Sequence, residues 1–284
     1  MSQQIIYGLV ERIYEVVRSI EDDAFGIAFS GGVDSSTLAV ACKRLKRKVT
    51  LLTIAFPGSN DIDISRETAL ELGLPLRWRS ITLETLEEGI QTVLGIIRFD
   101  RLAILENSVC FYYVFEVASE AGIRTVLSAN GMDELFCGYD LYRKYYGDEE
   151  ALMRVMDMLV ETARRDKAEI DKIAELWNIN YECPFLSDKF VEYAMSIPLD
   201  YKIRSKDDYL RKHALREAAL RMGVPESAAM RKKKAFQYSS GIHKAIRNLA
   251  RRRGYTKGKA KELGYSGEIE AYIKSLKSQI ESLG

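Results

Sequence analysis

The sequence predicts an α/β protein built on a doubly wound parallel sheet, with a second half that is helical. Three observations support this prediction. Short apolar runs alternate with amphipathic helical patterns over the first half of the chain, as in strands joined by helical crossovers. A glycine-rich turn joins the first of these runs to a helical pattern. From about residue 148 onward the strand-like runs stop, and helical patterns continue to the end.

The first half of the chain contains four candidate strands. They share a short apolar run bounded by turn residues, and they are residues 25–29, 49–55, 76–78 and 125–128. The candidate helices share apolar side chains spaced three or four residues apart, and they are residues 5–20, 37–45, 63–72, 83–97 and 109–121. Gly122 is expected to cap the last of these helices. The alternation predicts parallel strands with right-handed crossovers, whose ligands bind beyond the carboxyl ends of the strands.

The second half of the chain carries helical patterns only. The expected helices are residues 151–162, 167–176, 188–195 and 207–222, followed by a charged tail after residue 264. No linker rich in Pro, Gly or Ser separates the two halves, and the sequence has no internal repeat. We therefore expect a single domain over residues 1–284, with an α/β core over about 1–147 and a helical part over about 148–284 that completes its site.

Composition and charge narrow the class of protein. With 284 residues, 47% of them hydrophobic, the chain can bury a large core. Its 42 basic and 41 acidic residues leave a net charge of +1, which argues against binding nucleic acid through overall charge. The four cysteines are far apart and form no CxxC pair. We therefore expect buried thiols in a reducing compartment rather than a zinc ribbon or a redox dithiol. No signal peptide and no uncharged stretch as long as a membrane span is present, which favours a soluble protein of the cytoplasm.

The most informative segment is the glycine-rich turn at residues 30–36, which read SGGVDSS. Gly31 and Gly32 let the backbone approach a ligand closely and present several N–H donors to it. The helix that follows directs its positive end at the same place, which suits an anion. Asp34 adds a carboxylate and so implies a bridging cation, which makes ATP with magnesium the best fit. The loop lacks the lysine of a Walker A motif. The alternative is a turn without chemical function.

A second loop follows the fourth candidate strand. Residues 127–139 read LSANGMDELFCGY, with a turn at Gly131 and with Asp133 and Glu134 at the start of a helix. If both loops end strands of one sheet, Asp34 and Asp133 can share a magnesium ion, each supplying oxygen ligands. The alternative is that the acidic pair only complements the dipole of its own helix.

Together, these two loops resemble a known family. The first resembles the SGGxDSS loop of the PP-loop ATP pyrophosphatases, which split ATP between its α- and β-phosphates. The pair is similar to the signature loops of the asparagine synthetase family, where the second usually reads SGxGxDExFxGY. Residues 181–188, YECPFLSD, resemble the R-x-PFLD stretch of that family, although Glu182 stands in place of Arg and Ser187 is inserted before Asp188. Residues 231–241, RKKKAFQYSSG, resemble its R-x-K segment.

The resemblance covers residues 25 to about 246, and it implies a PP-loop fold and a set of site residues. The residues assigned to ATP are Phe29, Ser30, Gly31, Gly32, Asp34, Ser35, Ser36, Ile54, Ser128 and Gly131. Of these, Phe29, Ile54 and Ser128 would frame the adenosine through their backbones. Asp34 and Asp133 would hold Mg²⁺, and Lys233 would contact the phosphates and stabilise the leaving pyrophosphate. Lys232 and Lys234 flank Lys233 and offer the same charge. Residues 57–61, PGSND, match the loop that the family has after its second strand, although an ordinary Pro-Gly turn reads the same way.

Two departures from the family bear on the substrates. Family members that hydrolyse glutamine begin with a glutaminase domain, whose nucleophilic cysteine follows the initiator Met. Here Ser2 occupies that position and no such domain precedes the glycine-rich turn. The resemblance therefore implies free ammonia, another amine or a separate glutaminase subunit as nitrogen source. Asn130 replaces the Glu of asparagine synthetases. Since an amide cannot accept a proton as a carboxylate does, we expect a catalytic or specificity role for Asn130 and a carboxylate other than aspartate.

The sequence thus predicts a carbon–nitrogen ligase similar to asparagine synthetase, which adenylates a carboxylate with ATP and transfers ammonia or another amine to it. One alternative is a PP-loop enzyme that adenylates a tRNA base, supported by the basic residues 231–234 and 251–253 together with Lys257, Lys259 and Lys261. Another is an ATP-binding subunit without turnover, for which Asn130 is the only support. The sequence leaves open the carboxylate, the nitrogen donor and the oligomeric state, including a homodimer.

Overall fold

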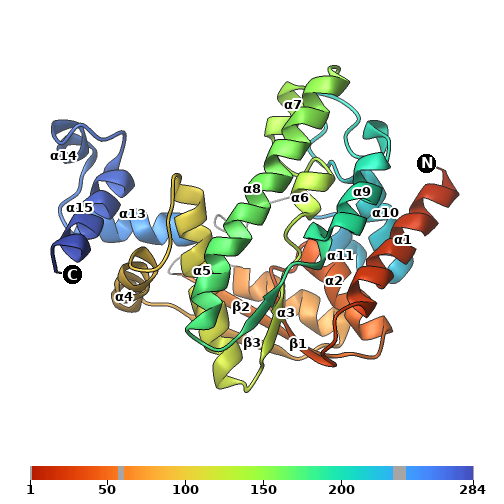
Figure 1. Cartoon of the computed structure of the whole chain (residues 1–284), viewed down its shortest axis with the longest axis horizontal. Helices are drawn as coiled ribbons and strands as arrows, with labels where there is room; N and C mark the ends of the chain where they lie inside the picture. The colour runs from red at the N-terminus through yellow and green to blue at the C-terminus, as the bar shows by residue number, and fades with distance from the viewer. Residues whose placement is uncertain (1, 57–60, 233–240, 284) are drawn as a thin grey trace.

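The protein is described by a computed structural model that covers residues 2–56, 61–232 and 241–283. Its centre is a five-stranded sheet in the order β3-β2-β1-β4-β5, and all of its printed pairings are parallel (Figure 1). The strands are β1 (Ala24–Ala28), β2 (Lys48–Ala55), β3 (Leu76–Ser80), β4 (Thr125–Leu127) and β5 (Asn180–Glu182). The chain reverses direction across the sheet at β1 and β4, where two neighbouring strands end in the two loops predicted to bind ligand.

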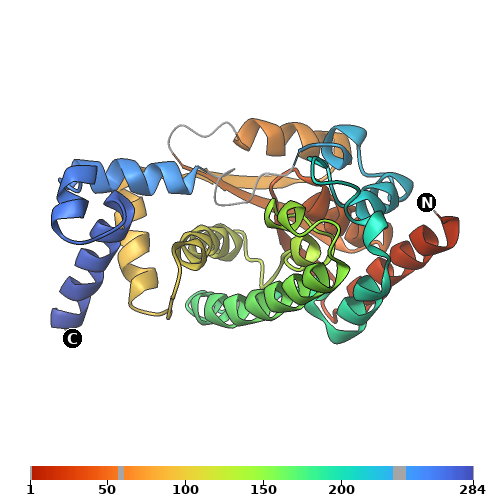
Figure 2. The same cartoon turned by 90° about the horizontal axis from the view of Figure 1, so that it is seen from above.

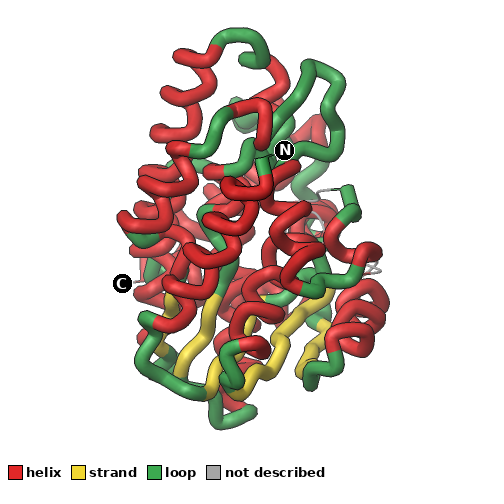
Figure 3. Tube along the Cα trace, turned by 90° about the vertical axis from the view of Figure 1, so that its right-hand side faces the viewer, coloured by secondary structure: helices red, strands yellow, loops and turns green. Residues whose placement is uncertain are grey.

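Helices cover both faces of the sheet, as Figures 2 and 3 show. One face is covered by α1 (Gln3–Arg18), α2 (Val33–Arg44), α3 (Asp61–Leu72) and α10 (His213–Met222). The other face is covered by α5 (Leu102–Glu120), with α4 (Leu83–Leu94) and α8 (Glu149–Glu175) packed against it. Because side chains alternate along a strand, Leu51 of β2 is buried in the first layer and Leu52 in the second. The core therefore consists of two apolar layers separated by the sheet.

The second half of the chain adds shorter elements around this frame. They are α6 (Met132–Leu135), α7 (Leu141–Lys144), α9 (Asp188–Ser196), α11 (Glu226–Ala229), α13 (Ile242–Arg252), α14 (Lys257–Glu262) and α15 (Glu268–Leu283). Two 3-10 turns also belong to it, Pro184–Leu186 and Leu199–Tyr201. Helices α13 and α15 pack on α4 at the end of the molecule farthest from the N-terminus (Figures 1 and 2).

The predicted fold class, a doubly wound parallel sheet with a helical second half, is confirmed. Several expectations within it are wrong, among them the start of the helix expected at 109–121, which begins at Leu102. The second half does contain a strand, β5, whose three residues are too few to give a periodic signal. The helices expected at 151–162 and 167–176 are one helix, α8, because no Gly or Pro interrupts the segment between them. The helix expected from residue 207 begins only at His213.

The late start of α10 has a local cause. The buried carboxylate of Asp208 accepts hydrogen bonds from the backbone N–H groups of Arg204, Leu210 and Arg211. Arg211 and Lys212 then both take positive φ angles, 49° and 55°, which a continuous right-handed helix excludes. The chain therefore makes a tight turn in front of α10, and this turn fixes the position of Lys212.

Helix α5 is the apolar element at the centre of the second layer. Among the described helices, it alone is long and apolar enough by length and composition to cross a membrane. Its window of highest hydropathy is 67% buried within the protein, and the helix packs on β1, β2 and β3 as well as on α4 and α8. Its apolar character is accounted for by the core. The four cysteines are free and buried, as predicted.

Candidate functional site

The glycine-rich turn lies at the carboxyl end of β1 and leads directly into α2. Gly32 is the N-cap of this helix, so the first free N–H groups of α2 lie within the turn. Gly31 has a φ of 68°, and a Cβ at this position would lie 3.1–3.2 Å from Thr68, Ile64 and Arg231. Arg231 also donates a hydrogen bond of 2.9 Å to the carbonyl of Gly31. The turn therefore has a backbone conformation that favours glycine. Arg231, from the second half of the chain, stabilises it.

The second loop lies at the carboxyl end of β4, the strand next to β1. Gly131 has a φ of 103°, and a Cβ there would approach the carbonyl oxygen of Phe185 to 2.9 Å. The carboxylate of Glu134 accepts hydrogen bonds from the N–H of Gly131, at 3.1 Å, and from the hydroxyl of Tyr139, at 2.6 Å. Glu134 thus stabilises its own loop through hydrogen bonds. Phe185, from the 3-10 turn Pro184–Leu186 after β5, packs against the same loop.

Asp34 and Asp133 meet at a single ammonium group. The Nζ atom of Lys212 lies 2.7 Å from both carboxylate oxygens of Asp34 and 2.5 Å from Oδ1 of Asp133. Lys212 is fully buried. A Cβ at Gly138 would lie 2.0 Å from the Asp133 carboxylate and 2.4 Å from Cε of Lys212, so a larger residue has no room. The two loops therefore place both predicted metal ligands around one point of positive charge.

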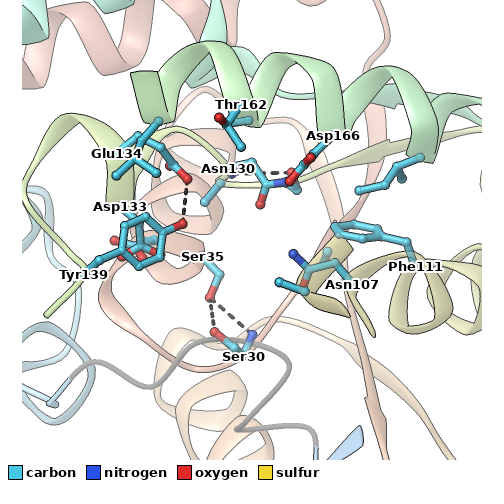
Figure 4. A pocket seen from close by; sticks show the side chains of 18 of the residues that line it. Ser30, Ser35, Asn107, Phe111, Asn130, Asp133, Glu134, Tyr139, Thr162 and Asp166 are labelled. Atoms are coloured by element: carbon cyan, nitrogen blue, oxygen red, sulfur yellow. Dashed lines mark hydrogen bonds between the residues drawn. The ribbon is translucent and has the colours of Figure 1, made fainter. Parts of the chain in front are cut away.

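A cavity of about 430 Å³ opens over both loops. The loop residues that line it are Ala28, Ser30, Asp34, Ser35, Ser128, Ala129, Asn130, Asp133, Glu134 and Tyr139. Its remaining walls come from α5 and α8 and the segments beside them (Figure 4). The hydroxyl of Ser35 lies 3.3 Å from the N–H of Ser30 and 3.4 Å from its hydroxyl, so both serines face this space.

Comparison with known proteins identifies the family of the chain. The asparagine synthase family model matches residues 11–168 and 148–270. The chain belongs to the asparagine synthase family. It is 30% identical over 272 residues to the putative glutamine-hydrolyzing asparagine synthetase 1 of Methanocaldococcus jannaschii, covering 84% of this chain and 50% of the relative. It is 28% identical over 237 residues to the glutamine-hydrolyzing asparagine synthetase B of Escherichia coli, covering 78% of this chain and 42% of that protein. The chain thus spans about half the length or less of these relatives.

Two solved structures align with the chain at low sequence identity. The NMN synthetase of Francisella tularensis aligns with 98% of this chain and 94% of its own, at 13% identity and a TM-score of 0.45. The ammonia-dependent NAD synthetase of Campylobacter jejuni aligns with 49% of this chain and 61% of its own, at 22% identity and a TM-score of 0.34.

Not every residue predicted for this family site lies in the cavity wall. Phe29 and Ile54 are core side chains, so only their backbones can face a ligand, as expected. Ser36 is fully buried under the turn, and its hydroxyl has no hydrogen-bond partner among the described residues. Lys233 and residues 57–60 lie outside the described residues, as does Lys234. Lys232 is exposed, with its Nζ 6.0 Å from the ring centre of Tyr209.

Asn130 is held by a small polar network under the second loop. Its Nδ2 donates a hydrogen bond of 3.1 Å to the hydroxyl of Tyr181. That hydroxyl lies 2.8 Å from the hydroxyl of Ser128, which in turn lies 3.3 Å from the sulfur of Cys183. Burial raises the pKa of Tyr181 well above its usual range, so its hydroxyl keeps its proton. Asn130 therefore has a fixed orientation.

Lys212 is the residue that sequence analysis missed. It lies outside the four segments that resemble the family, and it falls in a stretch that the helical pattern assigned to a helix interior. A neighbouring residue stabilises its turn, because buried Arg216 donates to the carbonyl oxygens of Leu210, Arg211 and Arg231 at 2.8, 2.8 and 3.0 Å. Only the tertiary structure reveals this arrangement, since 178 positions separate Lys212 from Asp34.

Proposed function

We propose that this chain is an ATP-dependent, AMP-forming ligase that activates a carboxylate and transfers its acyl group to ammonia or another amine. The observation that carries the proposal is the convergence of Asp34 and Asp133, from the ends of two adjacent strands, beside a glycine-rich helix start. Membership in the asparagine synthase family supports the same reaction.

The residues of the two loops fit a nucleoside triphosphate and its metal ion. The N–H groups at the start of α2 and the hydroxyls of Ser30 and Ser35 can donate to phosphate oxygens. The buried hydroxyl of Ser36, without a partner among the described residues, adds a further donor at the same helix end. Asp34 and Asp133 offer the carboxylate oxygens that Mg²⁺ prefers. When bound, magnesium would neutralise charge on the phosphates, and Lys233 is proposed to do so as well.

The proposed reaction has two steps. An oxygen of the substrate carboxylate attacks the α-phosphorus of ATP, and the bond to the β-phosphate breaks with loss of pyrophosphate. The nitrogen of ammonia or of an amine then attacks the activated carbonyl, AMP leaves, and the nitrogen releases a proton. In the first step the protein would position the reactants and stabilise the negative charge on the phosphates. In the second step the walls formed by α5 and α8 would keep water from the adenylate.

The geometry makes the alternative of a tRNA-modifying enzyme less favourable. Each arginine of the basic cluster at 251–253 lies next to a glutamate: Arg251 contacts Glu268 at 2.7 Å, Arg252 lies 3.6 Å from Glu84, and Arg253 contacts Glu87 at 2.9 Å. The charge of these three arginines is therefore largely compensated, which weakens their support for binding a phosphate backbone.

We also propose that the protein is located in the cytoplasm, a reducing compartment that suits four free thiols.

The test of the proposal is product analysis. The full chain is incubated with ATP, magnesium, ammonium and a panel of carboxylates, and AMP, ADP and pyrophosphate are quantified. We expect AMP and pyrophosphate in equal amounts, only when an accepted carboxylate is present, and a loss of at least a hundredfold in the Asp133→Asn variant. Asp157→Asn, at an exposed position of α8, is the matched control and should keep full activity. ADP as the product would overturn the proposal.

A further inference from the structure

The part of the cavity that lies between α5 and α8, called here the helical compartment, has side chains that bear on the substrate of the proposed ligase. One wall is a single face of α8, whose cavity residues recur every three or four positions: Leu159, Thr162, Ala163, Asp166 and Ile170. The facing wall is a stripe of α5 with a spacing of four: Ala103, Asn107 and Phe111. Asn130 lies between these walls (Figure 4).

Three polar side chains of this part of the cavity offer hydrogen-bond acceptors, and a fourth, Asn107, can both donate and accept. The hydroxyl of Thr162 donates its proton to the carbonyl of Met158 at 2.8 Å and accepts a hydrogen bond of 3.3 Å from Nη2 of Arg165, which leaves it one lone pair for a ligand. Asn130 donates one N–H of its amide to Tyr181 and keeps its second N–H and its carbonyl oxygen, of which the oxygen can accept. Asp166 is a carboxylate and, when ionised, can only accept. A ligand group that meets all three must donate hydrogen bonds.

The charges of the compartment also favour a ligand group that donates hydrogen bonds. Of the described residues that line the cavity, Arg101 is the only cation. Its Nη2 lies 2.5 Å from Oδ2 of Asp166 and also contacts Oδ1, so its charge is already compensated. The Asp166 side chain is 22% exposed. Each of its oxygens has a further lone pair for a second donor. A second carboxylate on the substrate would find no uncompensated positive charge among the described lining residues.

The rest of the compartment is apolar. Ala103, Phe111, Leu141, Leu159 and Ala163 line it, with Ile170 at the end of the α8 stripe. Such a lining favours a hydrocarbon body, because its burial removes apolar surface from water.

From these three features we propose that the substrate is an amino carboxylate with an apolar body and no second carboxylate. Its ammonium group is received by Asp166, Thr162 and Asn130, whose acceptors match the three donors of a primary ammonium. Its carboxylate is left at the loop end of the cavity, where activation takes place. This inference rests on the proposed function, because it assumes that the carboxylate is adenylated.

The first experiment compares substrates of equal length in the pyrophosphate assay. The probes are 5-aminopentanoate and 2-aminopentanoate, which carry an amine, pentanoate, which carries none, and pentanedioate, which carries a second carboxylate. We expect at least one of the amino compounds to exceed both others about tenfold or more in kcat/KM. Equal rates with pentanoate, or a preference for pentanedioate, would overturn the inference and leave the ligase intact. Failure of every carboxylate to release pyrophosphate would instead overturn the proposed function and the inference with it.

The second experiment removes the proposed ammonium acceptor. Asp166→Asn should raise KM for the amino substrate about tenfold with kcat little changed, and leave KM for pentanoate unaltered. Because the change also releases Arg101, the variant should accept pentanedioate better than the wild type does. Thr162→Val should raise KM for the amino substrate only, without disturbing the ion pair. Asp157→Asn, at an exposed position of the same helix, is the control and should change neither constant. If KM rises equally for amino and deamino substrates in both Asp166→Asn and Thr162→Val, the two residues have only a structural role and the inference is wrong.

Discussion

At the scale of single residues, the buried lysine between two aspartates is the unusual feature of this chain. Lys212 and Lys202 are both fully buried, but their surroundings differ. Lys212 lies between Asp34 and Asp133, whereas the Nζ of Lys202 has no hydrogen-bond partner among the described residues. Burial lowers the pKa of Lys202 to about 8, so its charge is easily given up. The two lysines therefore form a matched pair for mutation.

Replacing Lys212 by Met should destabilise the fold by about 3 kcal/mol or more, because it leaves two carboxylates facing each other in a buried site. Mn²⁺ should then raise the melting temperature of Lys212→Met more than that of the wild type, since a divalent cation can take over the lost charge. Lys202→Met should be neutral or stabilising, because it removes a buried charge without a partner. Urea unfolding and thermal melts with and without Mn²⁺ measure these effects. A Lys212→Met protein as stable as the wild type would show that the ammonium does not hold the two loops together.

At the scale of elements, the turn before α10 depends on the ionised form of one carboxyl group. Burial acts to raise the pKa of Asp208, but hydrogen bonds from the Arg211 N–H, the His213 ring and the Arg204 N–H outweigh it and lower the pKa. A depressed pKa in the folded state contributes stability that is present above the unfolded pKa of about 3.9 and is lost as pH falls through the folded value.

Asp208→Asn should therefore cost about 2 kcal/mol at pH 7, and the difference from the wild type should shrink as pH is lowered from about 4 to 2. Urea unfolding at a series of pH values measures this difference. Asp207→Asn is the neighbouring control, because that side chain is 89% exposed, and it should change stability little at any pH. A difference that stays constant down to pH 2 would mean that the charge of Asp208 does not support the turn.

The same elements show what the sequence can and cannot predict. The two loops and their strands were predictable because glycine turns, strand ends and helix starts are local features, as at Gly31 and Gly131. The continuity of α8 across Asp166 was not recognised, since a break in apolar spacing need not break a helix when each residue tolerates helical angles. The place of Lys212 depends on consecutive positive φ angles and on contacts with both halves of the chain, and no local pattern encodes them.

At the scale of the whole molecule, the site joins the two halves of the chain. Lys212 and Arg231 of the second half bind Asp34 and Gly31 of the first half, and β5 extends the sheet begun by β1 to β4. Contacts of this kind make the α/β part and the helical part depend on each other for stability. The two parts should then unfold together as one domain.

The chain offers a direct test, because its two tryptophans, Trp78 in β3 and Trp177 after α8, lie in different halves. Trp78→Phe leaves Trp177 as the only tryptophan reporter, and Trp177→Phe leaves Trp78, when fluorescence is excited where tyrosine does not absorb. In both variants the fluorescence transition in urea should have the same midpoint as the transition followed by far-UV circular dichroism. ATP with magnesium at about a hundred times its Kd should raise both midpoints by an amount equivalent to about 2.7 kcal/mol in the free energy of unfolding. Asp34→Asn in each background removes a proposed metal ligand and should abolish that shift. A Trp177 transition that precedes the Trp78 transition, or that ATP leaves in place, would mean that the helical part folds apart from the nucleotide site, because a ligand stabilises only the unit whose unfolding releases it.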